Sequence, residues 1–195
     1  MKIVKQTFCG LACALALALG SGAHAGLATF DNPSLITIDN VTNVATYTES
    51  GLRFSGDAAS YLPLDLIGRG GTGGLFVLAN SPLSLMADGG SGLFSLLSLD
   101  YGRDPFDLSA SGTLSVHGVL ADNSVLDEVL ALGNLTSFSF QGWTALKEVS
   151  LLADAVFVLD NVSSVPVPEP ASLALVGVAL SGLVVTRRRN TSVRQ

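Results

Sequence analysis

The chain has 195 residues, a net charge of −6 and a mean hydropathy of +0.52, which is high for a soluble domain. All but Glu169 of the 16 acidic residues lie between residues 26 and 164, where the accompanying basic residues are Arg53, Arg69, Arg103 and Lys147. Nucleic acid binding needs clustered Lys and Arg, so this composition excludes nucleic acid as a partner.

A secretory signal peptide is predicted over residues 1–25. Two lysines form a basic start, residues 8–19 form a short apolar core, and small residues stand at Ala23 and Ala25. The core is too short to span a bilayer stably. We expect a signal helix that the Sec machinery exports and that is cut after Ala25, with cleavage after Ala23 as the neighbouring alternative.

Both cysteines, Cys9 and Cys13, lie within this apolar core. If the segment is removed, the processed protein has no disulfide, thiolate metal site or cysteine nucleophile. The competing interpretation is a lipoprotein signal that ends at Cys13. Gly10 stands where an apolar residue is usual, and the apolar run continues past the cysteine, so an ordinary signal peptide is favoured.

The region 26–164 is predicted to be one all-β domain. Short segments with alternating polar and apolar residues, separated by turn residues, are typical of half-buried antiparallel strands. A helix is an alternative only for 125–132, which we interpret as a strand. The predicted strands are 35–39, 44–48, 75–79, 94–100, 113–117, 125–132, 136–140, 147–151 and 156–162. Their number and spacing favour an antiparallel β-sandwich or jelly roll.

The second half of this domain resembles the galactose-binding-like jelly rolls that accompany some bacterial sorting signals. The similar stretches are 94–100 (FSLLSLD), 112–122 (GTLSVHGVLAD), 138–149 (FSFQGWTALKEV) and 157–162 (FVLDNV). In such domains a last strand that ends in Asp-Asn, here Asp160-Asn161, runs directly into a proline-rich stalk. The resemblance supports the fold more than any activity.

Jelly-roll sugar-binding domains often carry a structural Ca²⁺ that ties the first strand to the last. By that resemblance Asp31, Asp160 and Asn161 are candidate oxygen ligands for such an ion. The alternative, which we favour, is that these residues cap strands and turns through backbone hydrogen bonds. No other cofactor is expected.

Trp143 and His117 are the remaining candidate site residues. Trp143 is the only tryptophan, and an exposed indole can stack on a sugar, although core packing is the commoner role. His117 is the only histidine outside the signal segment, and we expect a structural or surface role for it. No catalytic motif such as GxSxG or HExxH occurs, so no catalytic residue is assigned.

The C-terminal region has three parts in a fixed order. Residues 165–170 form a proline-rich stalk that contains Val167, Pro168, Glu169 and Pro170. Residues 171–189 combine an apolar run with the arginines Arg187, Arg188 and Arg189, and residues 190–195 form a short polar tail. A helix over the apolar run is a marginal transmembrane span, and the arginines favour a cytoplasmic C-terminus.

These features resemble the PEP-CTERM sorting signal, which is also called an ice-binding-protein C-terminal motif. The resemblance implies that an exosortase cuts the chain near the Pro-Glu-Pro sequence at the outer side of the inner membrane. The alternative is a plain membrane anchor behind a proline-rich stalk.

The sequence therefore predicts an exported bacterial protein of the cell surface or extracellular polysaccharide matrix. The central domain is expected to be non-catalytic and to bind glycan or act as an adhesin. Two alternatives stay open: a secreted carbohydrate-active hydrolase, and a membrane-tethered binding module that keeps its tail.

Overall fold

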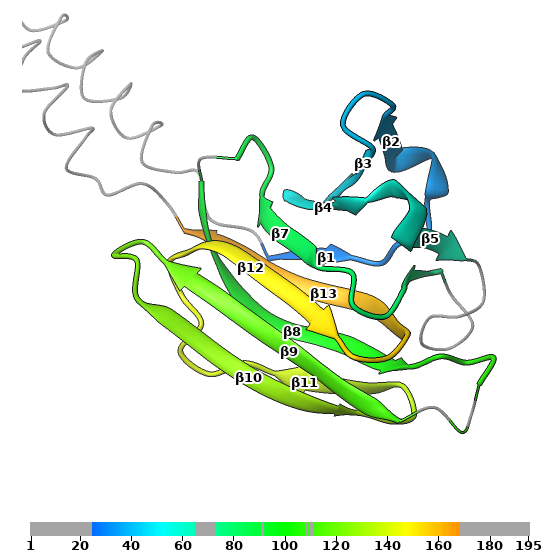
Figure 1. Ribbon diagram of the computed structural model, residues 1–195. Coiled ribbons are helices and arrows are strands. Elements are labelled where there is room, and N and C mark those ends of the chain that lie inside the picture. Colours follow the sequence, from blue (N-terminus) through cyan, green and yellow to red (C-terminus); the bar gives the residue numbers. More distant parts are fainter. Residues whose placement is uncertain (1–24, 65–72, 91, 108, 110, 168–195) are drawn as a thin grey trace, which may run out of the picture. The chain divides into compact units, whose positions relative to one another are not determined.

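The computed structural model describes residues 25–64, 73–90, 92–107, 109 and 111–167 (Figure 1). The predicted signal helix and transmembrane helix lie outside these residues. The described chain contains two 3-10 turns, η1 (Pro33–Leu35) and η2 (Ala58–Ser60), and no helix long and apolar enough to cross a membrane. The strands are β1 (Gly26–Ala28), β2 (Ile36–Asp39), β3 (Val44–Glu49), β4 (Leu52–Asp57), β5 (Tyr61–Leu64), β6 (Gly74–Val77), β7 (Leu83–Ala87), β8 (Leu93–Arg103), β9 (Gly112–Leu120), β10 (Val125–Leu132), β11 (Thr136–Ser139), β12 (Leu146–Ala153) and β13 (Phe157–Val167).

The strands form two antiparallel sheets. The first has the order β2-β3-β4-β7-β12-β9-β10. In the second, β8 lies between β11 and β13, while β6 and β1 pair with successive parts of the far edge of β13, and β5 extends β6. One pair, Leu146 with Phe94, joins the two sheets. The structure is an all-β antiparallel sandwich of the jelly-roll type, which confirms the predicted fold class.

The core lies between the two sheets and follows from the period of two in the strands. Leu114 and Val116 of β9, Val149 and Leu151 of β12 and Leu99 of β8 are all almost completely buried. Alternate residues of each strand point to opposite faces, so the polar residues between them face outward. The same alternation makes 125–132 a strand, as predicted.

Two strands of the first sheet were not predicted. In β4, Leu52 and Phe54 are buried, and in β7, Leu83 and Leu85 are buried, with polar or less buried residues between them. The alternation is therefore present in the sequence, but it extends over only five or six residues in each strand. Pairing with neighbours on both sides, β3 and β7 for β4, stabilises such short strands.

The last strand is longer than expected, and this corrects the predicted boundary of the stalk. Val165, Pro166 and Val167 were assigned to the stalk 165–170 but belong to β13, where they pair with the first residues of β8. Within the described chain, these three residues pair on that side only. A proline is tolerated there because its missing N–H is not needed by a neighbouring strand. The compact unit accordingly extends to Val167.

Candidate functional site

The outward face of the first sheet carries a continuous line of polar side chains. Asp127 of β10 is directly opposite His117 of β9, which is opposite Ser150 of β12, which is opposite Ser84 of β7. The line continues across the remaining three strands through Ser55, Thr46 and Thr37. We call these seven residues the polar row. Directly opposed residues of antiparallel strands share a face, so all seven lie on the same face of the sheet.

The dimensions of the polar row follow from the sheet. Neighbouring strands lie about 4.8 Å apart, so six steps from β10 to β2 extend over roughly 29 Å. Residues that flank the row in the inner strands, such as Leu85 beside Ser84 and Phe54 beside Ser55, are buried on the other face, whereas Glu128 and Ile38 beside its two ends are exposed. The polar row is therefore accessible from outside, while the adjacent positions hold the sandwich together.

His117 and Asp127 form the most polar end of the row. The His117 Nδ1 atom lies 2.6 Å from Asp127 Oδ1, and the two side chains are 47% and 65% exposed. The expected surface role of His117 agrees with this position. Asp, His and Ser are also the residue types of a hydrolytic triad. Among the described residues, however, no hydrogen bond joins His117 to Ser150, so only the first two members are coupled.

On the same face, the side chains on either side of the polar row include charged and apolar groups. On one side, Glu148 Oε1 accepts a hydrogen bond from Ser84 Oγ (2.6 Å), and Arg53 lies against the Met86 sulfur. Near the His117 end, exposed aliphatic groups flank the row on both sides, namely Val125 (52%), Val129 (66%) and Leu152 (44%). The face thus combines hydroxyl and charged groups with small apolar patches.

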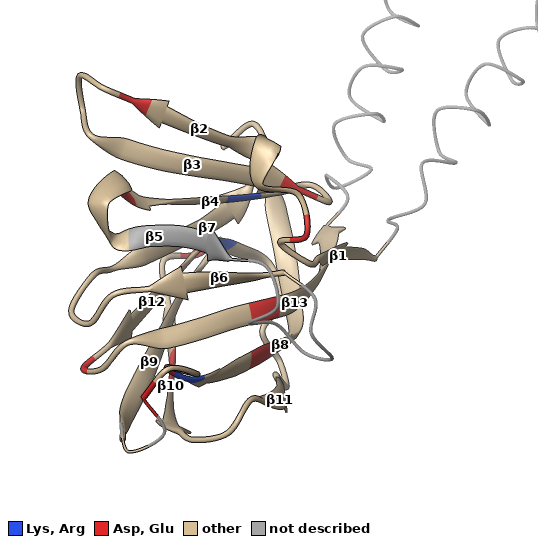
Figure 2. Cartoon of the chain, turned by 90° about the vertical axis from the view of Figure 1, so that its right-hand side faces the viewer, with Lys and Arg blue, Asp and Glu red and all other residues tan. Residues whose placement is uncertain are grey.

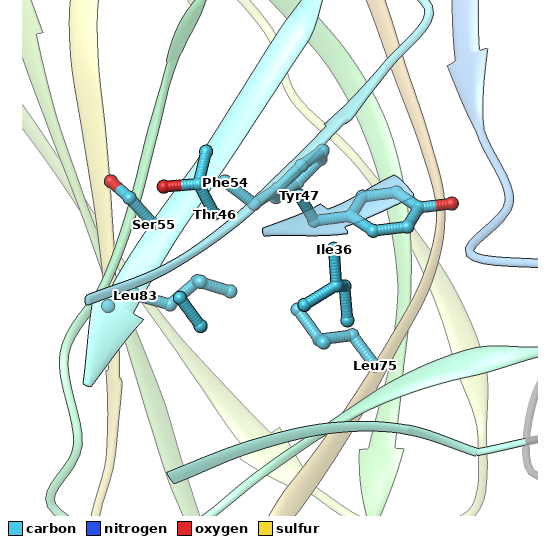
Figure 3. A pocket seen from close by; sticks show the side chains of 9 residues that line it. Ile36, Thr46, Tyr47, Phe54, Ser55, Leu75 and Leu83 are labelled. Atoms are coloured by element: carbon cyan, nitrogen blue, oxygen red, sulfur yellow. The ribbon is translucent and has the colours of Figure 1, made fainter. Parts of the chain in front are cut away.

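The space beneath this face is not a ligand pocket. A cavity of about 10 Å³ lies between the two sheets, and Ile36, Leu75 and Leu83 are among the residues that line it. It holds no more than one water molecule. In Figure 3 the aliphatic side chains point into this space, whereas the hydroxyl groups of Thr46 and Ser55 point away from Ile36 and Leu75.

Two of the three candidate calcium ligands meet a carboxylate that sequence reasoning did not select. Asp160 is opposite Asp100 in the β13–β8 pair, and these residues are 0% and 5% exposed. The Asn161 side-chain amide donates to Asp100 Oδ2 (3.0 Å) and Asp160 Oδ2 (3.1 Å). Ser137 Oγ also donates to Asp100 Oδ1. The sequence signal for Asp100 is its place at the end of the predicted strand 94–100.

The third candidate makes a different contact. Asp31 Oδ1 accepts a hydrogen bond from the backbone N–H of Gly73 (2.7 Å). Within the described ranges, no three His, Cys, Asp or Glu side chains come together as a metal-binding group. Backbone capping, the alternative favoured from the sequence, describes the contact of Asp31 with Gly73. Calcium binding by Asp31, Asp160 and Asn161 stays a prediction.

Trp143 lies in the core. The indole is 4% exposed and packs against Phe140, with ring centroids 4.7 Å apart. It also lies so close to Gly118 that a Cβ atom there would be 2.8 Å from the Trp143 Cζ3 atom. The sugar-stacking role considered for Trp143 needs an exposed ring face, and the structure contradicts that requirement.

The processing sites adjoin the ends of the sandwich. Ala25 is exposed and directly precedes β1, whose first residue, Gly26, is opposite Ser164 of β13. Val167 is the last residue of β13. Ala23, Pro168, Glu169, Pro170 and the arginines Arg187, Arg188 and Arg189 lie outside the described residues.

The comparisons with known proteins identify the C-terminal segment. Residues 166–189 match the family model for the PEP-CTERM protein-sorting motif. The chain therefore carries a PEP-CTERM protein-sorting motif, as its residues predicted, and this motif marks it as an exported protein. Comparison with curated proteins found no match.

Several solved structures are similar in fold. The CBM22-1 and GH10 modules of a Clostridium thermocellum xylanase, in complex with xylohexaose, match with 17% identity and a TM-score of 0.40 over 73% of this chain. An exo-β-agarase matches with 11% identity and a TM-score of 0.43 over 75%. This chain spans 28% and 26% of the length of those two chains. The CBM22-1 xylan-binding domain of Paenibacillus barcinonensis matches with 11% identity, a TM-score of 0.39 and coverage of 76% of this chain and 99% of that domain.

Proposed function

We propose that this exported protein is a substrate of an exosortase that cuts it within Val167–Pro170. The apolar run within segment 171–189 holds the precursor in the inner membrane with its C-terminus in the cytoplasm. Cleavage then delivers the β-sandwich to the cell surface or the extracellular polysaccharide matrix. There the sandwich acts as a non-catalytic domain that binds glycan.

The position of the sorting motif at the end of the last strand is the observation that supports the proposed sorting. β13 ends at Val167, while the match to the sorting motif begins at residue 166. At the other end, the expected signal cleavage after Ala25 directly precedes β1. Both cuts thus fall at the margins of the compact unit, so removal of the two terminal segments leaves each strand of the described residues and its pairing intact.

The exposed face of the first sheet supports glycan binding. Sugars present hydroxyl groups together with apolar C–H faces, and this sheet face offers hydroxyl and charged groups beside small aliphatic patches. The surplus of carboxylates in the domain disfavours phosphate- or uronate-rich polymers by like-charge repulsion. A neutral polysaccharide carries no charge, so the carboxylates do not repel it.

A hydrolase is less well supported. Asp100 and Asp160 are opposed carboxylates, but both are buried, so a polysaccharide does not reach them. The Asp127–His117 pair is exposed on an open sheet face, whereas catalytic sites are usually concave. Release of reducing sugar by the purified protein, with loss of that release in His117→Ala, would favour the hydrolase alternative.

The sorting proposal is tested by the intact mass of the protein from membrane and medium fractions. In the native host we expect a product that begins at Gly26 and ends within Val167–Pro170. The variant Glu169→Ala, or deletion of the exosortase, should leave the precursor in the membrane fraction with its tail. Glu128→Ala, an exposed carboxylate on β10, is the matched control and should be processed normally.

Glycan binding is tested separately with the processed protein. Affinity electrophoresis in gels that contain xylan, mannan or soluble cellulose should retard it, whereas polygalacturonate should not. Equal mobility in all gels would refute glycan binding and leave the sorting proposal untouched. The intact mass separates this proposal from the membrane-tethered alternative, in which the tail is still present.

A further inference from the structure

We propose that Met86 is an oxidation site, where a peroxide converts the thioether to a sulfoxide and Arg53 binds the sulfoxide oxygen. The inference goes beyond the proposed sorting and glycan binding and depends on neither. Met86 lies on β7 and Arg53 on β4, and the two residues are directly opposite each other in the first sheet. Both side chains are half-buried.

Met86 carries the one sulfur atom outside the predicted signal peptide. The sequence has two methionines and two cysteines, and Met1, Cys9 and Cys13 all belong to that peptide. An oxidant outside the cell therefore meets a single thioether in the processed protein.

Arg53 contacts this sulfur and has a further donor without a partner. Its Nη2 atom donates to Met86 Sδ at 3.6 Å, and a thioether sulfur is only a weak acceptor. The Nε atom of the same guanidinium is buried and has no hydrogen-bond partner among the described residues. Nε–H and Nη2–H project from the same edge of the planar group, so the unpartnered donor points to the side on which the sulfur lies.

The reaction needs only the protein and a peroxide. A lone pair of the Met86 sulfur attacks one oxygen of hydrogen peroxide and the O–O bond breaks. The transferred hydroxyl gives its proton to the departing hydroxide, which leaves as water. The sulfur loses two electrons, and the peroxide gains them. Methionine sulfoxide reductases reverse the change.

The guanidinium edge of Arg53 suits the product better than the thioether. Methionine has three rotatable side-chain bonds, so the new oxygen can turn toward Nε–H and Nη2–H. Hydrogen bonds from a charged donor are roughly twice as strong as neutral ones, and a buried donor without a partner lowers stability. The oxygen supplies the missing partner.

The position of Met86 in the strand keeps the added oxygen away from the core. Leu85 and Ala87, on either side of it, are buried between the sheets, so Met86 lies on the outward face. Sulfoxide formation disrupts packed cores. Here it should leave the sandwich at least as stable as before.

A free anion is a less suitable partner for this edge of Arg53. The Met86 sulfur already lies against it, and Gly90 is also near, since a Cβ atom there would be 3.3 Å from Nη2. The acidic charge of the domain repels anions.

The test treats the purified processed protein with hydrogen peroxide and compares each protein with its own reduced form by urea denaturation. Peptide mass spectrometry should find one added oxygen at Met86. The urea midpoint of the unchanged protein should stay equal or rise, whereas that of Arg53→Leu should fall. The two responses should differ by at least roughly 0.5 M urea, because a hydrogen bond to a charged group is lost in the variant.

Arg103→Leu is the matched control. Arg103, on β8 of the second sheet, also has a buried Nε without a partner in the described chain, but it is paired with Phe157 rather than Met86. This variant should respond to oxidation as the unchanged protein does. An equal fall of the midpoint in the unchanged protein and in Arg53→Leu would overturn the proposal. So would a Met86 that stays reduced in peroxide that oxidises free methionine.

The arginine Nε–H signals of the unchanged protein give a second measurement that needs no variant to fold. Oxidation should shift the Arg53 Nε–H proton signal downfield and leave that of Arg103 in place, and treatment with the reductases should restore the first spectrum. An Arg53 signal that does not move when Met86 is oxidised would refute binding of the sulfoxide by Arg53.

Discussion

Asp100 and Asp160 are directly opposite each other on β8 and β13, and the side-chain amide of Asn161 donates to both carboxylates. Figure 2 shows the two acidic segments side by side on these adjacent strands. Both aspartates are buried. Buried carboxyl oxygens need hydrogen-bond donors, so an amide that contacts both aspartates contributes strongly to stability.

Removal of the Asn161 amide is expected to destabilise the sandwich. Asn161 has φ 46°, in the left-handed region, so Asn161→Gly keeps that backbone conformation while removing the two hydrogen bonds. We expect a loss of about 1–3 kcal/mol in the free energy of unfolding, measured by urea denaturation. The control is Asn123→Gly at an exposed turn with φ 68°, which removes only a solvent-exposed hydrogen bond from Lys147 Nζ and should change stability by less than about 0.5 kcal/mol. Equal effects at both sites would contradict a special role for Asn161.

Gly118 should not tolerate a side chain. A Cβ atom at this position would lie 2.8 Å from Trp143 Cζ3 and 2.9 Å from Leu146 Cδ2, closer than real contacts allow. We expect Gly118→Ala to lower the stability by about 1–3 kcal/mol because the buried ring must move. At Gly133 the added atom has nothing within 4 Å, so Gly133→Ala provides the matched control. A thermal or urea midpoint for Gly118→Ala that equals the Gly133→Ala midpoint would show that this part of the core is loosely packed.

The position of Trp143 predicts its fluorescence. As the only tryptophan, and 4% exposed, it should emit at short wavelength and resist quenching by iodide. Addition of oligosaccharide should leave that quenching unchanged, whereas a ring that stacks on sugar would respond. Trp143→Ala should cost about 3–5 kcal/mol of stability. Phe106→Ala, which removes a ring that is 73% exposed, should cost much less.

Tyr47 should make the domain sensitive to alkaline pH. Burial, and next the nearby Glu49 carboxylate, raise the pKa of Tyr47 above its usual value of 10.0. The phenol donates a hydrogen bond to Glu49 Oε2 (3.1 Å). Because the folded state holds this proton more tightly than the unfolded chain, the resulting stability is complete below pH 10 and is lost as the pH rises above it.

The measurement is the urea midpoint at about pH 8 and about pH 11 for the unchanged protein and for Tyr47→Phe. At about pH 8 the variant should be less stable by about 0.5–1.5 kcal/mol, because it lacks one hydrogen bond. Between the two pH values the variant should lose less stability than the unchanged protein. An equal loss in both proteins would assign the alkaline sensitivity to other groups.

Local patterns accounted for most strands and for few of the contacts at the candidate site. Alternation over 113–117 and 125–132 predicted β9 and β10, because the period of two is a property of neighbouring residues. It also placed His117 on a strand, with a structural or surface role. Neither pattern indicated that Asp127 and Ser150 lie on either side of His117, because that depends on which strands pair and in which register.

The sequence alone determined the C-terminal sorting motif and the antiparallel β class of the domain. A sorting motif is read as a linear order of residues, and strand alternation is equally local, so both are visible without a fold. Only the tertiary structure decided that Trp143 is buried, that Asp100 faces Asp160, and that seven polar residues form one row. Each of these depends on pairing between strands that are distant in the chain, and burial of the shared core selects that pairing.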